Sequence, residues 1–458
     1  MAWNARKAAS PLLIVTALAA LSPAFAAGTG ESCDSLAAGR FDPQKPAAVP
    51  GTEIADAAAA ITACEAAVKD MPAEPRYRFE LGRAYLAGKR FKEAREAFTK
   101  ASDAGYAAAT GNLGKLYENG DGVQADLKKA FDFYSRAAAA GVPIAAHNLG
   151  TLYRDGRGTT KDFARAAAYF KIAADAKYPP AITALGLAYR DGNGVEADVH
   201  TAMAILKTAA DLGEVEAMDA LGGLFDNTEG IEPDAKQAIA WYRKAADAGD
   251  AAAMSHLGFA LAGLDDGTDR KQEILEWHRK AAEGGQAASM VELGYAYEQG
   301  DGLAKNIDQA VKWYKKAADL GDPDGENNIG VMYYQGTGIE QDFAKARQYY
   351  EKAMAQGQTL AFLNAAYLYG EGDGVAVNGV KAAELFMSAL TGGEQGALDE
   401  LNEPSIEWPK DFYTSLQKRL KRAGFYSGAI TGRFGPESME AARAAFNSDN
   451  GEDGASAE

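Results

Sequence analysis

Apolar and polar positions repeat with a fixed period along most of the chain. A Leu-Gly pair recurs every 36 residues from Leu113-Gly114 to Leu293-Gly294, and Ile329-Gly330 and Ala365-Ala366 continue the series. Within each period, apolar residues spaced three and four apart predict two amphipathic helices. A fixed period of this length is typical of solenoids, in which each helix pair packs on its neighbours. The sequence therefore predicts an all-α solenoid of stacked antiparallel helix pairs.

The first helix of each period, here called helix A, carries the Leu-Gly pair and an aromatic residue one turn later, as in Leu113 and Tyr117. Glycine lowers helix propensity by about 1 kcal/mol relative to alanine. Its recurrence inside a helix predicts a close backbone approach between helices, where a side chain would collide.

A glycine loop and a second helix, helix B, complete each period. Paired glycines such as Gly120 and Gly122 permit the positive φ angles of a tight turn. This loop lacks the Lys-Ser/Thr of a phosphate-binding loop and follows a helix, not a strand. The position four residues after the second glycine is Asp in some repeats and Asn in others. This interchange predicts an N-cap rather than an ion ligand. The glycines that end helix B are expected in the C′ position: they are Gly141, Gly213, Gly249, Gly285, Gly321 and Gly357.

The motifs LG-x-x-Y, G-x-G-V-x-x-D and WY-x-KAA resemble the Sel1-like repeat, a longer relative of the tetratricopeptide repeat. The resemblance covers eight units within residues 107–396, and the unit 71–106 looks like an ordinary tetratricopeptide repeat. It implies a right-handed superhelical solenoid. The units with Asn227–Gly230 and Gly263–Gly267 depart from the loop pattern, so we expect the solenoid to be most irregular there.

The first 26 residues have the pattern of a cleaved secretory signal. Arg6 and Lys7 precede an apolar run that is too short to span a bilayer, and Ala24-Phe25-Ala26 fits a signal-peptidase site. A buried N-terminal helix is the alternative. We expect a periplasmic protein without an integral membrane segment after cleavage.

Residues 27–70 are expected to cap the first repeat. In an oxidising compartment the two cysteines, Cys33 and Cys64, are expected to form a disulfide that encloses a proline-rich stretch. Two free buried thiols are the alternative, and a catalytic cysteine is disfavoured because this region has no histidine.

Beyond a linker expected at 397–409, residues 410–447 resemble a small three-helix peptidoglycan-binding domain, through Leu416-Gln417, Gly424-Phe425-Tyr426 and Gly432-x-Phe434-Gly435-Pro436. Thr431, Ser438 and Asn447 depart from its pattern. The segment has seven basic and three acidic residues, which suits an anionic wall polymer. The resemblance implies wall contact through Phe425, Tyr426, Arg433 and Phe434. The alternative is an intramolecular C-terminal cap. The acidic tail 448–458 is expected to be disordered.

Composition excludes several other functions. The chain has 458 residues and a net charge of −17, which disfavours nucleic-acid binding. Its four histidines are far apart in sequence, and no nucleophile–base–acid constellation is visible, so we predict no cofactor, no metal and no enzymatic activity.

Recognition is expected on the concave face, which helix A lines in tetratricopeptide-type solenoids. An amide before Leu-Gly can pair with the backbone of an extended peptide, although it can equally bond to a neighbouring helix. The candidate partner-binding residues are Asn112, Asn148, His256, Phe259, Glu292, Tyr295, Asn328 and Asn364.

These features favour a periplasmic protein–protein interaction scaffold that the C-terminal module holds at the cell wall, with peptidoglycan as a second partner. The alternative is a regulator that binds and restrains the periplasmic domain of a membrane-anchored sensor. A wall hydrolase is disfavoured because catalytic residues are lacking.

Overall fold

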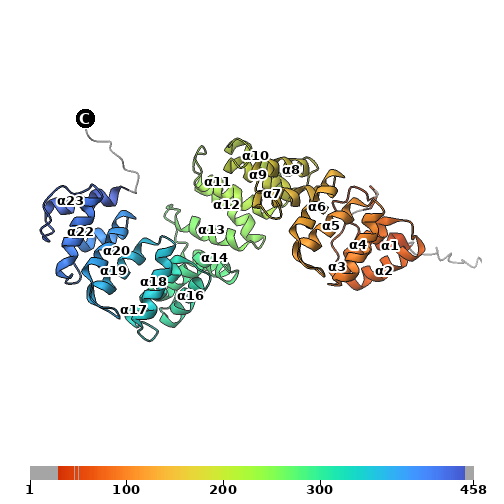
Figure 1. Ribbon diagram of the computed structural model, residues 1–458. Helices are drawn as coiled ribbons and strands as arrows, with labels where there is room; N and C mark the ends of the chain where they lie inside the picture. The colour runs from red at the N-terminus through yellow and green to blue at the C-terminus, as the bar shows by residue number, and fades with distance from the viewer. Residues whose placement is uncertain (1–28, 46, 50, 449–458) are drawn as a thin grey trace, which may run out of the picture. The chain divides into compact units, whose positions relative to one another are not determined.

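The computed structural model describes residues 29–45, 47–49 and 51–448. The predicted signal segment 1–26 and all but the first residue of the predicted tail 448–458 lie outside the described residues. Every regular element in the described part is an α-helix, which confirms the all-α solenoid class (Figure 1).

The chain divides into two compact units, residues 1–205 and 206–458, and each is described by itself. Helix α10 (Val199–Asp211) contains the point of division. The other helices of the first unit are α1 (Thr29–Ala37), α2 (Ala57–Asp70), α3 (Pro75–Ala87), α4 (Phe91–Asp103), α5 (Ala107–Asn119), α6 (Leu127–Ala139), α7 (Pro143–Asp155), α8 (Phe163–Asp175) and α9 (Pro179–Asp191).

The second unit contains the remaining repeats and the C-terminal helices (Figure 1). Its helices are α11 (Val215–Asp226), α12 (Ala235–Asp247), α13 (Ala251–Ala262), α14 (Lys271–Glu283), α15 (Ala287–Gln299), α16 (Ile307–Asp319), α17 (Pro323–Gln335), α18 (Phe343–Ala355), α19 (Thr359–Glu371), α20 (Gly379–Thr391), α21 (Gln395–Asn402), α22 (Lys410–Arg422) and α23 (Pro436–Asn447). Odd-numbered helices from α5 to α19 are A helices, and even-numbered ones from α6 to α20 are B helices.

The glycine of most Leu-Gly pairs makes room for an aromatic ring of the following B helix. A Cβ added to Gly294 would lie 2.5 Å from the ring of Tyr314, and one added to Gly330 would lie 2.7 Å from the ring of Tyr350. The nearest neighbour at these glycines is therefore a ring, and at Gly330 the Ala346 carbonyl oxygen of the next helix also lies 3.4 Å from the added Cβ. Both tyrosines are almost fully buried.

The capping predictions for helix B are confirmed. Asp126 Oδ1 accepts the Lys129 N–H at 3.0 Å, and Asn306 Oδ1 accepts the Gln309 N–H at 3.1 Å. Asp and Asn both cap the helix because each has a side-chain oxygen that accepts a backbone N–H of the first turn. The six glycines predicted at the C′ position all have positive φ angles, between +82° and +96°.

The two irregular units differ from the others as expected. Helix α11 ends at Asn227 in an extended conformation, and α13 ends at Gly263 in the right-handed helical region, where other A helices end at a left-handed glycine. Helix α14 begins after Arg270 without a side-chain cap, whereas Asp234 still caps α12.

Helices α1 and α2 cover the start of the first unit and are joined by the Cys33–Cys64 disulfide. The segment between them continues onto the repeats, where Gln44 Oε1 accepts the Ala107 N–H at 2.6 Å at the start of α5. The Phe41 ring lies 5.1 Å from that of Tyr178. The described part of the predicted cap thus contacts the first repeats as well as the hairpin formed by α3 and α4.

The expectation of a linker at 397–409 is wrong. Residues 395–402 form α21, whose Leu398 and Leu401 are buried, and the Trp408 indole is buried and donates to Glu400 at 3.0 Å. The segment has apolar side chains, so it folds against the last repeat instead of remaining solvated.

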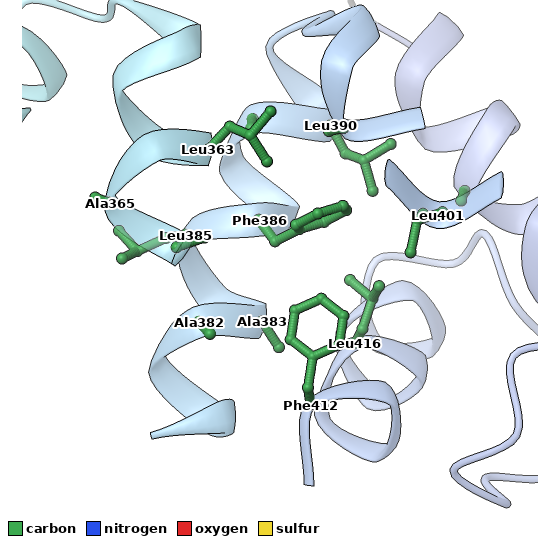
Figure 2. Close-up of a cluster of buried hydrophobic side chains, with 14 of the residues drawn as sticks. Leu363, Ala365, Ala382, Ala383, Leu385, Phe386, Leu390, Leu401, Phe412 and Leu416 are labelled. Carbon is green, nitrogen blue, oxygen red and sulfur yellow. The ribbon is translucent and has the colours of Figure 1, made fainter. Parts of the chain in front are cut away.

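Helix α22 covers the last B helix. Figure 2 shows Phe412 and Leu416 of α22 directed toward Phe386 of α20, and the rings of Phe412 and Phe386 are 5.3 Å apart. The module 410–447 therefore shares one apolar core with the last repeat, as its capping alternative expected.

Candidate functional site

Most polar side chains of the repeat motif bind within the fold. The buried Tyr134 and Tyr314 of the B helices donate to Glu118 and Glu298 at the ends of the preceding A helices, at 2.7 and 2.8 Å. Burial raises the pKa of both tyrosines, so the hydroxyls stay protonated donors. These pairs join the two helices of a repeat and are not available for chemistry.

The predicted recognition amides of the first unit are half-buried. Asn112 Nδ2 donates to the Ala108 carbonyl of its own helix at 2.9 Å. Asn148 lies within hydrogen-bonding reach of the Tyr134 hydroxyl. Neither amide projects freely into solvent.

The same position in the second unit links successive A helices. Asn364 Nδ2 donates to Asn327 Oδ1 at 2.8 Å, and Asn327 Nδ2 donates to Asn328 Oδ1 at 3.2 Å. Asn364 directly precedes Ala365-Ala366, the equivalent of Leu-Gly. Its partner Asn327 lies two residues before Ile329-Gly330, the equivalent pair of the preceding repeat. Asn327 is buried, and sequence reasoning missed it because we considered only the residue adjacent to Leu-Gly.

His256 makes the corresponding link to Asp219, with Nδ1 and Oδ1 2.8 Å apart. The hydrogen bond to Asp219 raises the pKa of His256, which favours an imidazolium paired with the carboxylate. His256 nevertheless leaves about half of its side chain exposed, at 47%.

The remaining candidates of the A helices are more open. Phe259 and Tyr295 are 41% and 54% exposed, although both are large and aromatic. Glu292 is half-buried, and burial together with the nearby Asp324 raises its pKa. These three residues lie on α13 and α15 of the second unit.

Three of the four predicted wall-contact residues are part of the C-terminal core. Tyr426 is buried and donates to the Ala429 carbonyl at 2.9 Å, while Phe425 and Phe434 pack partly buried against the same core. Only the Arg433 side chain is exposed.

Gln417, from the Leu-Gln motif, organises the loop that carries Arg433. Its buried amide donates to the Arg433 carbonyl at 2.8 Å and to Ser438 Oγ at 2.9 Å. Its Oε1 accepts the N–H groups of Thr431 and Gly432 at 3.0 and 2.9 Å. All four hydrogen-bonding positions of the amide are therefore used in shaping the loop.

The described residues contain one group of potential metal ligands in close reach, which is Cys33, Cys64 and Glu80. Both sulfurs belong to the disulfide, so neither is a thiolate ligand. Glu80 is 1% exposed and lies beside Asp34, and burial raises its pKa to about 9. A neutral carboxyl beside a disulfide is a poor metal site.

No helix among the described residues is long and apolar enough to cross a membrane.

Comparisons with known proteins identify the repeat. The Sel1 repeat model matches eight consecutive segments, residues 107–142, 143–178, 179–214, 215–250, 251–286, 287–322, 323–358 and 361–393. These segments agree with the eight units predicted from the Leu-Gly period.

Two solved structures are similar to most or half of the chain. A protective antigen of uropathogenic Escherichia coli strains, which displays an SLR fold, is 26% identical with a TM-score of 0.51, over 84% of this chain and 93% of that one. A Sel1 repeat protein from Oxalobacter formigenes is 31% identical with a TM-score of 0.50, over 53% of this chain and 99% of that one. No curated protein matches the chain.

Proposed function

Since the chain belongs to the Sel1 repeat family, whose members are generally protein–protein interaction scaffolds, we propose that it is a non-enzymatic periplasmic scaffold that holds a partner protein at the cell wall. The observation that carries the scaffold role is the run of eight consecutive repeats. Caps and interhelical bonds use the polar side chains of the motif, as in Asp126 and Tyr314, which leaves the outward positions of the helices for recognition.

The periplasmic part of the proposal rests on the signal-like first 26 residues. The disulfide supports it, because disulfides persist in oxidising compartments. Selective release of the mature chain by osmotic shock, with a cytoplasmic marker retained in the cells, is the expected result.

Wall contact is proposed through exposed cations of the C-terminal cap. Lys418 and Arg422 on α22 and Arg433 on the loop beyond it are exposed, and such charges attract an anionic polymer. Because aromatic residues of this module lie in the core, charge rather than ring stacking is expected to dominate.

Sedimentation with isolated sacculi tests this. Deleting residues 410–447 would uncover Phe386, so charge reversal is the cleaner change. The triple variant Lys418→Glu, Arg422→Glu and Arg433→Glu should stay in the supernatant while the wild type pellets. The matched control, Lys207→Glu, Lys236→Glu and Lys312→Glu, changes three exposed lysines of B helices by the same charge and should pellet. If all three proteins pellet alike, or none does, wall contact through the module is wrong.

A further inference from the structure

The A helices of the second unit have an unusual charge distribution. Helices α11, α13, α15, α17 and α19 contain no lysine or arginine, yet together they carry eight acidic residues. We call these five helices the A layer of the second unit. Their acids are Glu216, Asp219, Asp226, Glu292, Glu298, Asp324, Glu326 and Glu371.

The B helices of the same unit, and the A helices of the first, do not share this property. Every B helix from α12 to α20 has at least one lysine or arginine. In the first unit, α5, α7 and α9 contain Lys115, Arg154 and Arg190. The absence of lysine and arginine is therefore specific to one layer and does not follow from the repeat.

Two exposed aromatic rings of the A layer lack the cation that covers the tryptophans of the B helices, although Lys345 lies over Tyr333 of α17 at 5.1 Å. On the B helices, the lysine of WY-x-KAA lies over the tryptophan three residues earlier, as for Lys244 over Trp241 at 3.6 Å and Lys316 over Trp313 at 4.1 Å. On the A layer, Phe259 and Tyr295 are exposed, and within the described residues no lysine or arginine lies over either ring. The Phe259 ring makes a T-shaped contact with the ring of the buried His278, with centroids 4.8 Å apart.

The two rings and the nearest acids share one helix face. Phe259 and Tyr295 occupy the same position in successive repeats, 36 residues apart, each three residues after His256 and Glu292 respectively. His256 is bonded to Asp219, and Glu292 lies close enough to Asp324 for the two charges to interact. The face thus combines exposed aromatic area with the carboxylates of Glu292 and Asp324, neither of which has a lysine or arginine within ion-pair distance in the described chain.

We infer that the A layer of the second unit binds a cationic, apolar segment of a partner protein, with aliphatic side chains against Phe259 and Tyr295 and lysine or arginine side chains against Glu292 and Asp324. This inference rests on the proposed scaffold function and names the chemistry of the partner. Charge complementarity selects this occupant, because a nucleic acid or an acidic peptide would be repelled. Cations can also stack on the exposed rings, as the lysines of the B helices do on their own tryptophans.

Peptide binding to the purified full-length protein tests the inference. The probe is a fluorescein-labelled peptide of alternating lysine and leucine, compared with a glutamate–leucine and a lysine–serine peptide of the same length. The lysine–leucine peptide should bind most tightly, and its affinity should fall as salt rises because the carboxylates are partly exposed. Equal binding of the glutamate–leucine peptide would overturn the inference.

Two variants of the A layer locate the binding. Phe259→Ser with Tyr295→Ser, and Glu292→Gln with Asp324→Asn, should each weaken binding about tenfold or more. The matched control is Leu320→Ser with Glu283→Gln and Glu351→Gln, which removes an exposed apolar side chain and two exposed acids outside the layer. Unchanged circular dichroism confirms that each variant is folded. If the control weakens binding as much as the A-layer variants, the assigned surface is wrong.

Crosslinking in intact cells separates failure of this inference from failure of the scaffold role. A partner captured equally by the wild type and both A-layer variants leaves the scaffold intact and refutes the surface. Absence of any crosslinked partner refutes the scaffold itself.

Discussion

The side-chain amide of Asn364 donates a hydrogen bond of 2.8 Å to Asn327, which lies 37 residues earlier on the preceding A helix. His256 and Asp219 are separated by the same 37 residues and are joined at the same distance. A separation of 37 residues, one more than the repeat period, therefore marks a polar hydrogen bond between the A helices of successive repeats. At these positions the side chain we expected to bind a peptide is already bonded within the fold.

This link predicts that Asn327→Ala is destabilising. Asn327 is 1% exposed and bonds two amides, so its loss leaves buried groups unpaired at a cost of about 1–3 kcal/mol. Asn112→Ala is the control, since Asn112 bonds only its own helix, and it should change stability by less than about 0.5 kcal/mol. Urea unfolding followed by circular dichroism measures both. If the two variants have the same free energy of unfolding, the hydrogen bonds of Asn327 with Asn328 and Asn364 do not contribute to stability.

The contact between Gly294 and Tyr314 gives a second prediction. A Cβ at Gly294 would lie 2.5 Å from the tyrosine ring, whose hydroxyl is held by Glu298. Gly294→Ala should therefore cost about 1–3 kcal/mol through overpacking, despite its gain in helix propensity.

Gly111→Ala is the matched control for this substitution. Its Cβ would have no neighbour closer than 3.6 Å, so the change should stabilise the protein by up to about 1 kcal/mol. Tyr314→Leu should reduce the cost of Gly294→Ala when the two are combined. If both glycine variants are more stable than the wild type, the gain in helix propensity outweighs any collision with the Tyr314 ring, and the overpacking argument is wrong.

The sequence predicted the helices, caps and turn glycines well because each depends on residues close in the chain. Asp126 caps the helix that begins one residue later, and Gly141 follows the C-cap residue Ala140. Contacts between helices were harder to predict. The Leu-Gly period indicated that neighbouring helices touch, but it did not identify the ring of Tyr314 as the partner of Gly294.

His278 shows the same limit. The sequence did not predict a role for His278. The large separation of the four histidines along the chain argued only against a metal site. In the structure its ring takes the place of the tyrosine over Gly258 and contacts Ser289 Oγ at 3.0 Å. Burial lowers the pKa of His278 to about 4, which suits a neutral core ring.

The segment 397–409 was mispredicted because the repeat stops after residue 396, which led us to interpret Asn402 to Pro409 as a linker. Trp408 was the missed signal, since its ring stacks on Phe412 with centroids 4.1 Å apart. Large aromatic residues in a short polar connection indicate packing, and here they join the last repeat to its cap.

That aromatic stack predicts a large effect of Phe412→Ala. The side chain is fully buried between Phe386 and Trp408, so its truncation should cost about 3–5 kcal/mol. Val377→Ala, at a side chain 58% exposed, is the control and should change little. Thermal melting that follows the solenoid helices measures the effect. If residues 410–447 fold as an independent module, Phe412→Ala would leave that transition unchanged.

Glu80 predicts a pH dependence of stability. Its pKa is raised from 4.5 to about 9 by burial and by the neighbouring Asp34, with Arg76 and Arg83 acting in the opposite direction. The folded protein therefore holds a proton that the unfolded chain releases between these two values. The contribution is fully present below about pH 4.5 and is lost as pH rises toward 9.

The measurement compares melting temperatures of the wild type and Glu80→Gln between pH 5 and pH 9. The variant keeps a neutral side chain of the same shape, so it should match the wild type at pH 5 and exceed it at pH 9 by several degrees. Glu93→Gln, at an exposed carboxylate on α4, is the control and should follow the wild type throughout. A constant difference between Glu80→Gln and the wild type across this range would mean that Glu80 is ionised in the folded protein, with Arg76 and Arg83 outweighing its burial.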